Sequence, residues 1–307
     1  MRGAVLPLTG PGGEPVDLWR TFLSHGVASL PPLRIDAETR TLTATLPVGD
    51  TSRTVRIAEG APGFAAVSAV DGRPLDSPTL AAVRHVLRLD EDLSGFYRQI
   101  AGDPDLAWAT RGAGRLIRSA TVFEEVVKTV CTTNCAWSAT VRMVGALVEH
   151  LGVPGPAGRA FPTPVAMAEA GEAFYRDTAR AGYRGAYLLS LARSVAEGTI
   201  DLEVLGRPAP DGPNDDDVAT RLLALPGVGP YAVAHVMLLL GRYSRLVLDS
   251  WTRPKYARLA GLRGPNAVAG LRGPNVPDAD IVERFAPYGP YAGLAFWLYL
   301  TADWVEP

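Results

Sequence analysis

The residues best placed to do chemistry in this chain are a glycine turn, Leu225–Gly229, and one carboxylate downstream of it, Asp249. The turn reads LPGVG and lies between two helical patterns, so residues 216–240 form a helix-hairpin-helix pattern. Glycine lets a backbone approach a ligand without a Cβ in the way, and free amides at a helix start attract anions. We therefore expect a phosphate at this turn, although a hairpin that only packs would use the same residues.

Asp249 follows a short apolar run and stands alone in a basic segment. Residues 242–272 contain seven basic side chains, and Asp249 is their only acid. A basic segment suits phosphate contacts, and a carboxylate within it suits a reaction with a cationic transition state. Asp249 could instead cap a helix that starts near Ser250, and the two roles are compatible.

The composition restricts the class of protein. The chain has 307 residues, 47% of them hydrophobic, which suffices for two domains with real cores. No apolar run reaches the roughly 20 residues that span a bilayer, and no secretory signal is recognisable, so we expect a cytoplasmic protein without a membrane partner. Cys131 and Cys135 alone cannot form a disulfide framework or complete a zinc or iron–sulfur site. The four scattered histidines are expected in structural roles.

Strand patterns are confined to the N-terminal part. Residues 39–48, 51–58 and 64–70 alternate polar and apolar side chains between turn signals, which predicts an antiparallel meander. From about residue 89 onward the patterns are helical. We therefore predict an α+β protein, with a small antiparallel β-sheet domain and a flanking helix over 1–88 and an all-α domain over 89–307. The segment AGLRGPN at 260–266 recurs at 269–275 and is interpreted as a duplicated loop.

Leu225–Asp249 resembles the motif of the helix-hairpin-helix DNA glycosylase superfamily, which includes 8-oxoguanine glycosylase, bacterial 3-methyladenine glycosylase and endonuclease III. Three further segments are similar to the 8-oxoguanine glycosylase branch and occur in the same order: Phe123–Asn134, Gly182–Tyr187 and Tyr288–Asp303. The resemblance implies an enzyme of base excision repair. Such an enzyme extrudes a damaged base from double-stranded DNA and cleaves its N-glycosidic bond, leaving an abasic site.

The resemblance also implies roles for individual residues. Asp249 would be the catalytic carboxylate, stabilising an oxocarbenium-like sugar and helping water to attack C1′. The amides of Gly227–Gly229 would bind a DNA phosphate. The backbone carbonyls of Leu223, Leu225 and Val228 would hold a sodium or potassium ion, and no other cofactor is implied.

Four more residues are expected to contact DNA. By the resemblance, Asn134 would fill the gap left by the extruded base, Tyr183 would wedge into the stack, and Arg184 would contact the estranged partner base. Arg253, in the basic segment, is expected at the DNA backbone. Extrusion costs a few kcal/mol, which wedge residues offset.

The chain departs from the family pattern at informative positions. Tyr231 stands where bifunctional members carry a lysine nucleophile, and tyrosine cannot form a Schiff base, so we predict a monofunctional enzyme without AP lyase activity. Lys255 is too far from that position to substitute. Ala139 replaces the arginine that helps to read an opposite cytosine, and Phe296 and Leu300 replace the glutamine and phenylalanine that recognise an oxidised purine.

The base pocket is therefore expected to differ from that of 8-oxoguanine glycosylase. Tyr231, Trp251, Phe296 and Leu300, together with Trp297, could form an aromatic pocket that stacks on a cationic base, or could simply pack in the core. An alkylated or oxidised purine is the expected substrate of a monomeric enzyme. A bulky modified base in foreign DNA and a non-catalytic DNA-binding protein are the alternatives.

Overall fold

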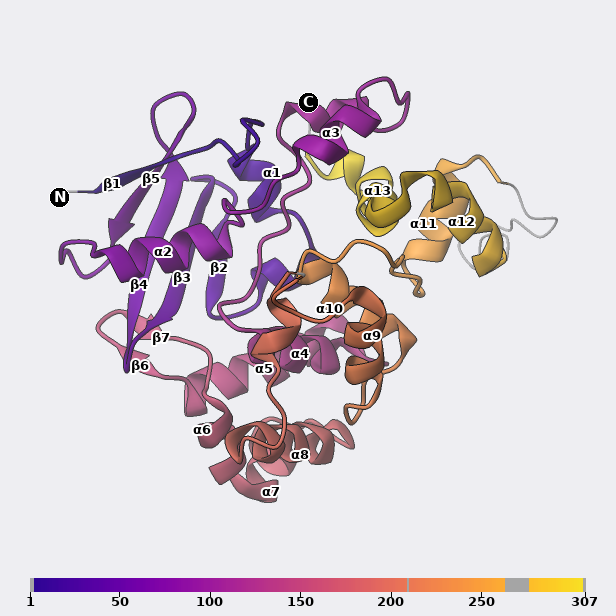
Figure 1. Ribbon diagram of the computed structural model, residues 1–307. Coiled ribbons are helices and arrows are strands. Elements are labelled where there is room, and N and C mark those ends of the chain that lie inside the picture. The colour runs from indigo at the N-terminus through magenta and orange to yellow at the C-terminus, as the bar shows by residue number, and fades with distance from the viewer. Residues whose placement is uncertain (1–2, 209, 263–275, 306–307) are drawn as a thin grey trace.

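The computed structural model describes residues 3–208, 210–262 and 276–305 (Figure 1). The duplicated AGLRGPN segment lies outside the described residues except for Ala260–Leu262. Within the described ranges, no helix is both long and apolar enough to cross a membrane.

The N-terminal part is an antiparallel sheet of five strands in the order β1-β5-β4-β3-β2. Its bounds are β1 (Ala4–Pro7), β2 (Leu33–Asp36), β3 (Thr41–Val48), β4 (Thr51–Glu59) and β5 (Phe64–Ala69). The predicted meander is confirmed as β3, β4 and β5. The outer strands β1 and β2 were not predicted, because each has only four residues and no clear alternation.

The sheet buries one face, as the alternation requires. Leu42 on β3 pairs with Ile57 on β4, which in turn pairs with Val67 on β5, and all three are fully buried. Helix α2 (Ser77–Val86) covers this face through Val83 and Val86. Asp76 begins α2 by accepting the Thr79 amide at 2.9 Å.

The rest of the described chain is mainly helical (Figure 1). Beside the short α1 (Leu18–Phe22), it comprises α3 (Ser94–Ile100), α4 (Val122–Thr132), α5 (Trp137–Leu151), α6 (Pro164–Glu169), α7 (Gly171–Ala173), α8 (Arg184–Ala196), α9 (Asp215–Leu223), α10 (Pro230–Leu239), α11 (Thr252–Leu259), α12 (Asp278–Phe285) and α13 (Ala292–Thr301). A short hairpin, whose strands β6 (Pro154–Gly155) and β7 (Gly158–Arg159) have two residues each, contacts β4. An α+β architecture is thus observed.

Helix α10 is the central helix of this part. Val233, Val236 and Met237 join a core built with α4, α5, α8 and α9. Ala234, Leu238 and Leu239 join a second core built with α3, α11, α12 and α13. An all-round apolar helix must be buried on every side, so α10 lies between the two cores and only its N-terminal end reaches the surface.

Side chains also connect the sheet to the helices. Val27 and Leu30, from the N-terminal part, belong to the core around α4. The buried Arg88 guanidinium donates from Nε to the Leu116 carbonyl at 2.8 Å and from Nη2 to the Leu239 carbonyl at the end of α10. The domain boundary between residues 88 and 89 remains a prediction.

Candidate functional site

The glycine turn connects α9 to α10 and presents its backbone to a cavity. Gly227 has a φ of +78°, and a Cβ there would come within 2.6 Å of the Tyr187 ring. A Cβ on Gly229 would meet nothing within 4 Å. Glycine at 227 is therefore required by conformation and by Tyr187, whereas the space over Gly229 is open to a ligand.

The predicted phosphate donors are only partly free. The Val228 amide donates to the Leu225 carbonyl at 3.2 Å, within the turn itself. The amides of Gly227 and Gly229 have no partner among the described residues. The expectation of three free amides is therefore corrected to two, which lie next to the N-terminus of α10. The cation expected at the carbonyls of Leu223, Leu225 and Val228 remains a prediction, and Leu225 already accepts one hydrogen bond.

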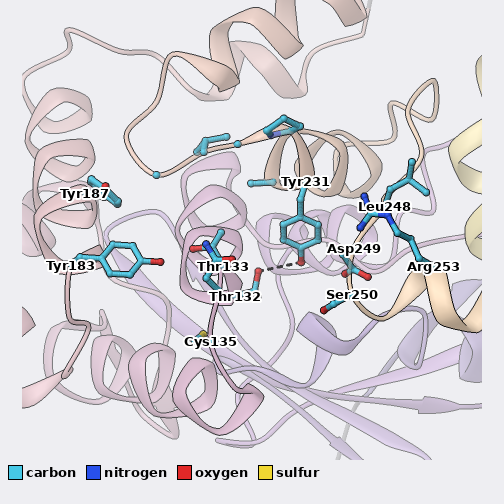
Figure 2. Close-up of a pocket in the computed structure, with 16 residues that line it drawn as sticks. Thr132, Thr133, Cys135, Tyr183, Tyr187, Tyr231, Leu248, Asp249, Ser250 and Arg253 are labelled. Atoms are coloured by element: carbon cyan, nitrogen blue, oxygen red, sulfur yellow. Dashed lines mark hydrogen bonds between the residues drawn. The ribbon is translucent and has the colours of Figure 1, made fainter. Parts of the chain in front are cut away.

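A cavity of about 690 Å³ lies in front of this turn (Figure 2). Tyr183 and Tyr187 of the α8 region lie on one side, Asp249 and Arg253 lie on the other, and Tyr231 lies between them. Tyr183 is 56% exposed, which suits the expected wedge role. Its ring meets the Tyr187 ring edge-on at 5.8 Å.

Asp249 is held by the start of the helix that follows it. Its Oδ1 accepts the amides of Trp251 at 2.8 Å and Thr252 at 2.7 Å, and its own amide donates to Thr252 Oγ1 at 2.8 Å. This reciprocal cap fixes the carboxylate and occupies one oxygen. Oδ2 has no partner among the described residues. The expected capping role is therefore present, and the side chain also lines the cavity.

A second cavity, of about 440 Å³, adjoins the first and shares Asp249 with it. Trp251, Trp297 and Trp304 form a cluster in its wall, with ring centroids 5.6–6.0 Å apart. Tyr231 and Asp249 line both cavities. The carboxylate therefore stands at the border between an open cavity along the glycine turn and an aromatic cavity behind it.

The predicted pocket residues divide into two groups. Tyr231, Trp251 and Trp297 line the second cavity, and their role in binding a base stays a prediction. Phe296 and Leu300 are fully buried in the core beside α12 and line neither cavity, so their assignment to the pocket is wrong. The reason is helical geometry: neighbouring residues of α13 are turned by about 100°, so Trp297 and Phe296 face different surroundings.

Arg184 also differs from expectation. It is only 7% exposed, its Nε donates to the Thr133 carbonyl at 2.9 Å, and its Nη2 donates to the same oxygen. The guanidinium lies 4.5 Å from the Tyr183 ring centre. The side chain is thus hydrogen-bonded to the turn after α4 and does not line the first cavity. Asn134, the next residue in that turn, is exposed with a φ of +47° and lines the first cavity.

Of the five basic side chains that the structure describes in the segment around Asp249, four are paired with acids from elsewhere in the chain. The ion pairs are Arg242 with Asp215 at 2.8 Å, Arg245 with Asp216 at 3.0 Å, Arg253 with Asp278 at 2.6 Å and Lys255 with Asp303 at 2.7 Å. These four positive charges are therefore not free for a ligand in this structure. Arg253 lines the first cavity while Asp278 holds it.

The residues of the second cavity that were not predicted include Trp137, Trp304 and His235. His235 follows Tyr231 by one helical turn, so its i+4 spacing could have indicated it. Its ring lies 5.7 Å from the Tyr231 ring, and its Nδ1 lies 3.2 Å from Thr129 Oγ1. No local pattern connects Trp137 or Trp304 to the cavity, because Trp137 begins α5 and Trp304 lies near the C-terminus, both far in sequence from Asp249. Within the described residues there is no metal-binding group of three or more His, Cys, Asp or Glu.

Comparisons with known proteins show which proteins this chain resembles. No protein-family model matches the chain. A Bacillus subtilis protein, YfjP, named provisionally as a DNA-3-methyladenine glycosylase, is 24% identical over 211 residues, which are 67% of this chain and 64% of that protein. The chain therefore spans just under two thirds of this relative.

Solved structures align over nearly the whole chain. A 3-methyladenine DNA glycosylase from Archaeoglobus fulgidus aligns with a TM-score of 0.72 and 17% identity, over 99% of this chain and 100% of its own. MBOgg1, in complex with a low-affinity DNA ligand, aligns with a TM-score of 0.73 and 17% identity, over 100% of both chains. The Clostridium acetobutylicum 8-oxoguanine glycosylase/lyase, in complex with DNA, aligns with a TM-score of 0.71 and 17% identity, over 99% of this chain and 96% of its own. The chain has the fold of these DNA glycosylases, which confirms the resemblance indicated by the motifs.

The buried histidines predict a fall in stability on acidification. Burial lowers the pKa of His25 to about 3 and the pKa values of His85 and His235 to about 4. Below pH 6.5, the ordinary pKa of histidine, these side chains therefore bind protons in the unfolded chain but not in the folded chain. The free energy of unfolding should decrease as pH falls from 6.5 towards 4. Glu125, whose pKa burial raises to about 7, opposes this trend with a single group. Urea unfolding between pH 4.5 and 6.5 measures the slope, and His235→Gln should reduce it by about 1.4 kcal/mol per pH unit.

Proposed function

We propose that the protein is a monofunctional DNA glycosylase, which extrudes a damaged purine from duplex DNA and hydrolyses its N-glycosidic bond with Asp249. The observation that carries this proposal is the position of Asp249, whose carboxylate borders both the open cavity and the aromatic cavity. A nucleotide whose phosphate lies at the glycine turn and whose base enters the aromatic cavity would bring its sugar past this carboxylate. The names of the solved relatives support the same class of reaction.

Asp249 can act on the sugar because its two oxygens have different surroundings. Oδ1 is fixed by the amides of Trp251 and Thr252, and Oδ2 is left for the substrate. When the bond between C1′ and the base breaks, its electron pair leaves with the base and positive charge develops on the sugar. A fixed anion stabilises that charge without reorganising. Water then adds to C1′ and passes its proton to Oδ2 of Asp249, which releases it to solvent.

An alkylated purine fits this site best. Methylation at a ring nitrogen gives the base a positive charge, which favours stacking on the electron-rich faces of Trp251, Trp297 and Trp304. Such a base also leaves as a neutral molecule, so its departure needs no proton donor. An oxidised purine or a bulky modified base from foreign DNA would share the extrusion step but would gain less from the aromatic wall.

The positions of the lysines support the proposal of hydrolysis without strand cleavage. Tyr231 occupies the position two residues after Gly229, and no lysine lines either cavity among the described residues. Lys128 is fully buried and pairs with Glu124 at 2.6 Å. Lys255 is held by Asp303. Neither amine is positioned to attack C1′.

The DNA surface would combine the turn with two exposed side chains. The amides of Gly227 and Gly229 would bind a phosphate, Tyr183 would enter the stack, and Asn134 would fill the space left by the base. Arg184 would act indirectly, because it holds the turn that carries Asn134. We propose a cytoplasmic monomer acting on the nucleoid.

Replacing Asp249 by Asn should abolish base release and leave DNA binding nearly unchanged. The amide oxygen can still accept the capping hydrogen bonds, so the loop should keep its shape while the negative charge is lost. We expect single-turnover release from methylated duplex DNA to fall by at least about 100-fold, measured by mass spectrometry of the free bases. Ser250→Ala, in the same cavity, is the control. Base release at the wild-type rate by Asp249→Asn would contradict the catalytic role of Asp249.

Sodium borohydride should trap no covalent adduct between the protein and lesion-bearing DNA. Trapping needs a Schiff base from an amine, and Tyr231 cannot supply one. Denaturing gel electrophoresis detects the adduct and also any cleaved strand. A trapped band that disappears in Lys255→Gln would contradict the monofunctional assignment and identify the amine.

Replacing Asp278 by Asn should strengthen binding to undamaged duplex DNA. The change releases Arg253, which lines the cavity and is otherwise held at 2.6 Å and 2.8 Å by this carboxylate. We expect the slope of log K against log salt to steepen by about 0.9, the value for one additional phosphate contact. Fluorescence anisotropy at several salt concentrations measures this slope.

Asp280→Asn is the matched control, because Asp280 lies on the same helix, is exposed and has no ion pair among the described residues. It changes the net charge by the same amount. An equal gain in both variants would show a general charge effect, and would contradict the assignment of Arg253 to the DNA backbone.

A further inference from the structure

His235 is an enclosed polar side chain of the second cavity that keeps a hydrogen-bonding atom free. It is 5% exposed and lines the cavity together with Asp249 and the tryptophan cluster. Three other polar side chains of the cavity donate to backbone carbonyls of α4, namely Thr132, Cys135 and Thr140. The Nδ1 atom of His235 contacts Thr129, and its Nε2 has no partner among the described residues.

The contact with Thr129 determines which nitrogen carries the proton. Thr129 is completely buried, and the only hydrogen-bond partner of its hydroxyl among the described residues is His235 Nδ1, at 3.2 Å. A buried hydroxyl without an acceptor costs about 1–3 kcal/mol. The hydroxyl hydrogen therefore points at Nδ1, and the imidazole hydrogen is on Nε2. Burial lowers the pKa of His235 to about 4, so the ring is neutral at pH 7 and brings no positive charge towards a cationic base.

We propose that His235 is a specificity-determining residue, whose Nε2–H donates a hydrogen bond to an acceptor atom on the edge of the extruded purine. The inference rests on the proposed function, because it takes the second cavity to be the base pocket. The tryptophans bind any flat base through its faces, and they cannot distinguish one edge from another. A single enclosed donor can make that distinction, since a base with no acceptor at that place leaves the donor unpaired.

Two methylated purines provide the test, because each lacks a different acceptor. In 7-methylguanine, N7 is blocked and N3 remains free, whereas in 3-methyladenine N3 is blocked and N7 remains free. One donor reaches only one edge of the base. Loss of the donor should therefore change the ratio of the two release rates, whereas a general loosening of the pocket should slow both releases alike.

The experiment uses duplex DNA treated with dimethyl sulfate, which contains both lesions. Single-turnover release of each base is measured by mass spectrometry for the wild type, His235→Leu and His235→Gln. We expect His235→Leu to change the ratio by about tenfold or more. We expect His235→Gln, which keeps an N–H donor on a side chain of similar reach, to stay within about threefold of the wild type.

Thr129 supplies a matched pair of variants outside the cavity. Thr129→Val removes the hydroxyl that fixes the imidazole proton and should shift the ratio in the same direction as His235→Leu, whereas Thr129→Ser should not. Affinity for a duplex with an abasic-site analogue and the thermal melting temperature report whether each variant is folded and binds DNA.

The outcomes separate this inference from the proposed function. An unchanged ratio in a folded His235→Leu, with release that still depends on Asp249, overturns the role of His235 alone. So does a His235→Gln variant that matches His235→Leu. Absence of Asp249-dependent release of either base by the wild type overturns both the inference and the choice of alkylated purines.

Discussion

Helix α10 is apolar around its whole circumference, and the arrangement of the site depends on burying it. Its residues divide between two cores, one with α4, α5, α8 and α9 and the other with α3, α11, α12 and α13. With its sides covered, only the N-terminal end can reach solvent. That end carries the glycine turn, and the first turns of the helix carry Tyr231 and His235 into the cavities on either side of Asp249. Burial of one helix thus fixes the turn, the cavity walls and their spacing.

Several charged side chains near the site form hydrogen bonds or ion pairs within the protein itself. Asp249 caps the start of α11 with one oxygen and presents the other to the cavities. Arg184 holds the Thr133 carbonyl and thereby the turn of Asn134. Ion pairs with Asp215 and Asp278 neutralise Arg242 and Arg253. A site organised this way depends on backbone amides and aromatic surfaces more than on free positive charge, which agrees with the net charge of −2.

The aromatic cavity is assembled from segments that are far apart in the chain. Val27 comes from the N-terminal part, Trp137 from the start of α5, His235 from α10, Trp251 from the loop before α11, and Trp304 from the C-terminal end. Such a cavity can change one wall without disturbing the turn or the carboxylate. In the proposed function, this would separate recognition of the base from the chemistry on the sugar.

The sequence by itself determined the features that depend on neighbouring residues. The strands β3, β4 and β5, the hairpin of α9 and α10 and the helix-capping role of Asp249 all follow from local spacing, because turns, caps and alternation act over a few residues.

Tertiary structure decided what depends on partners distant in sequence. It paired the basic segment with acids from other helices, turned Arg184 inward, and placed Trp297 rather than Phe296 at the cavity. Helix α13 is apolar on all sides, so no pattern within it could show which face meets the pocket. Which side chains meet in a cavity is fixed only when the helices pack, because packing brings together residues that no local spacing relates.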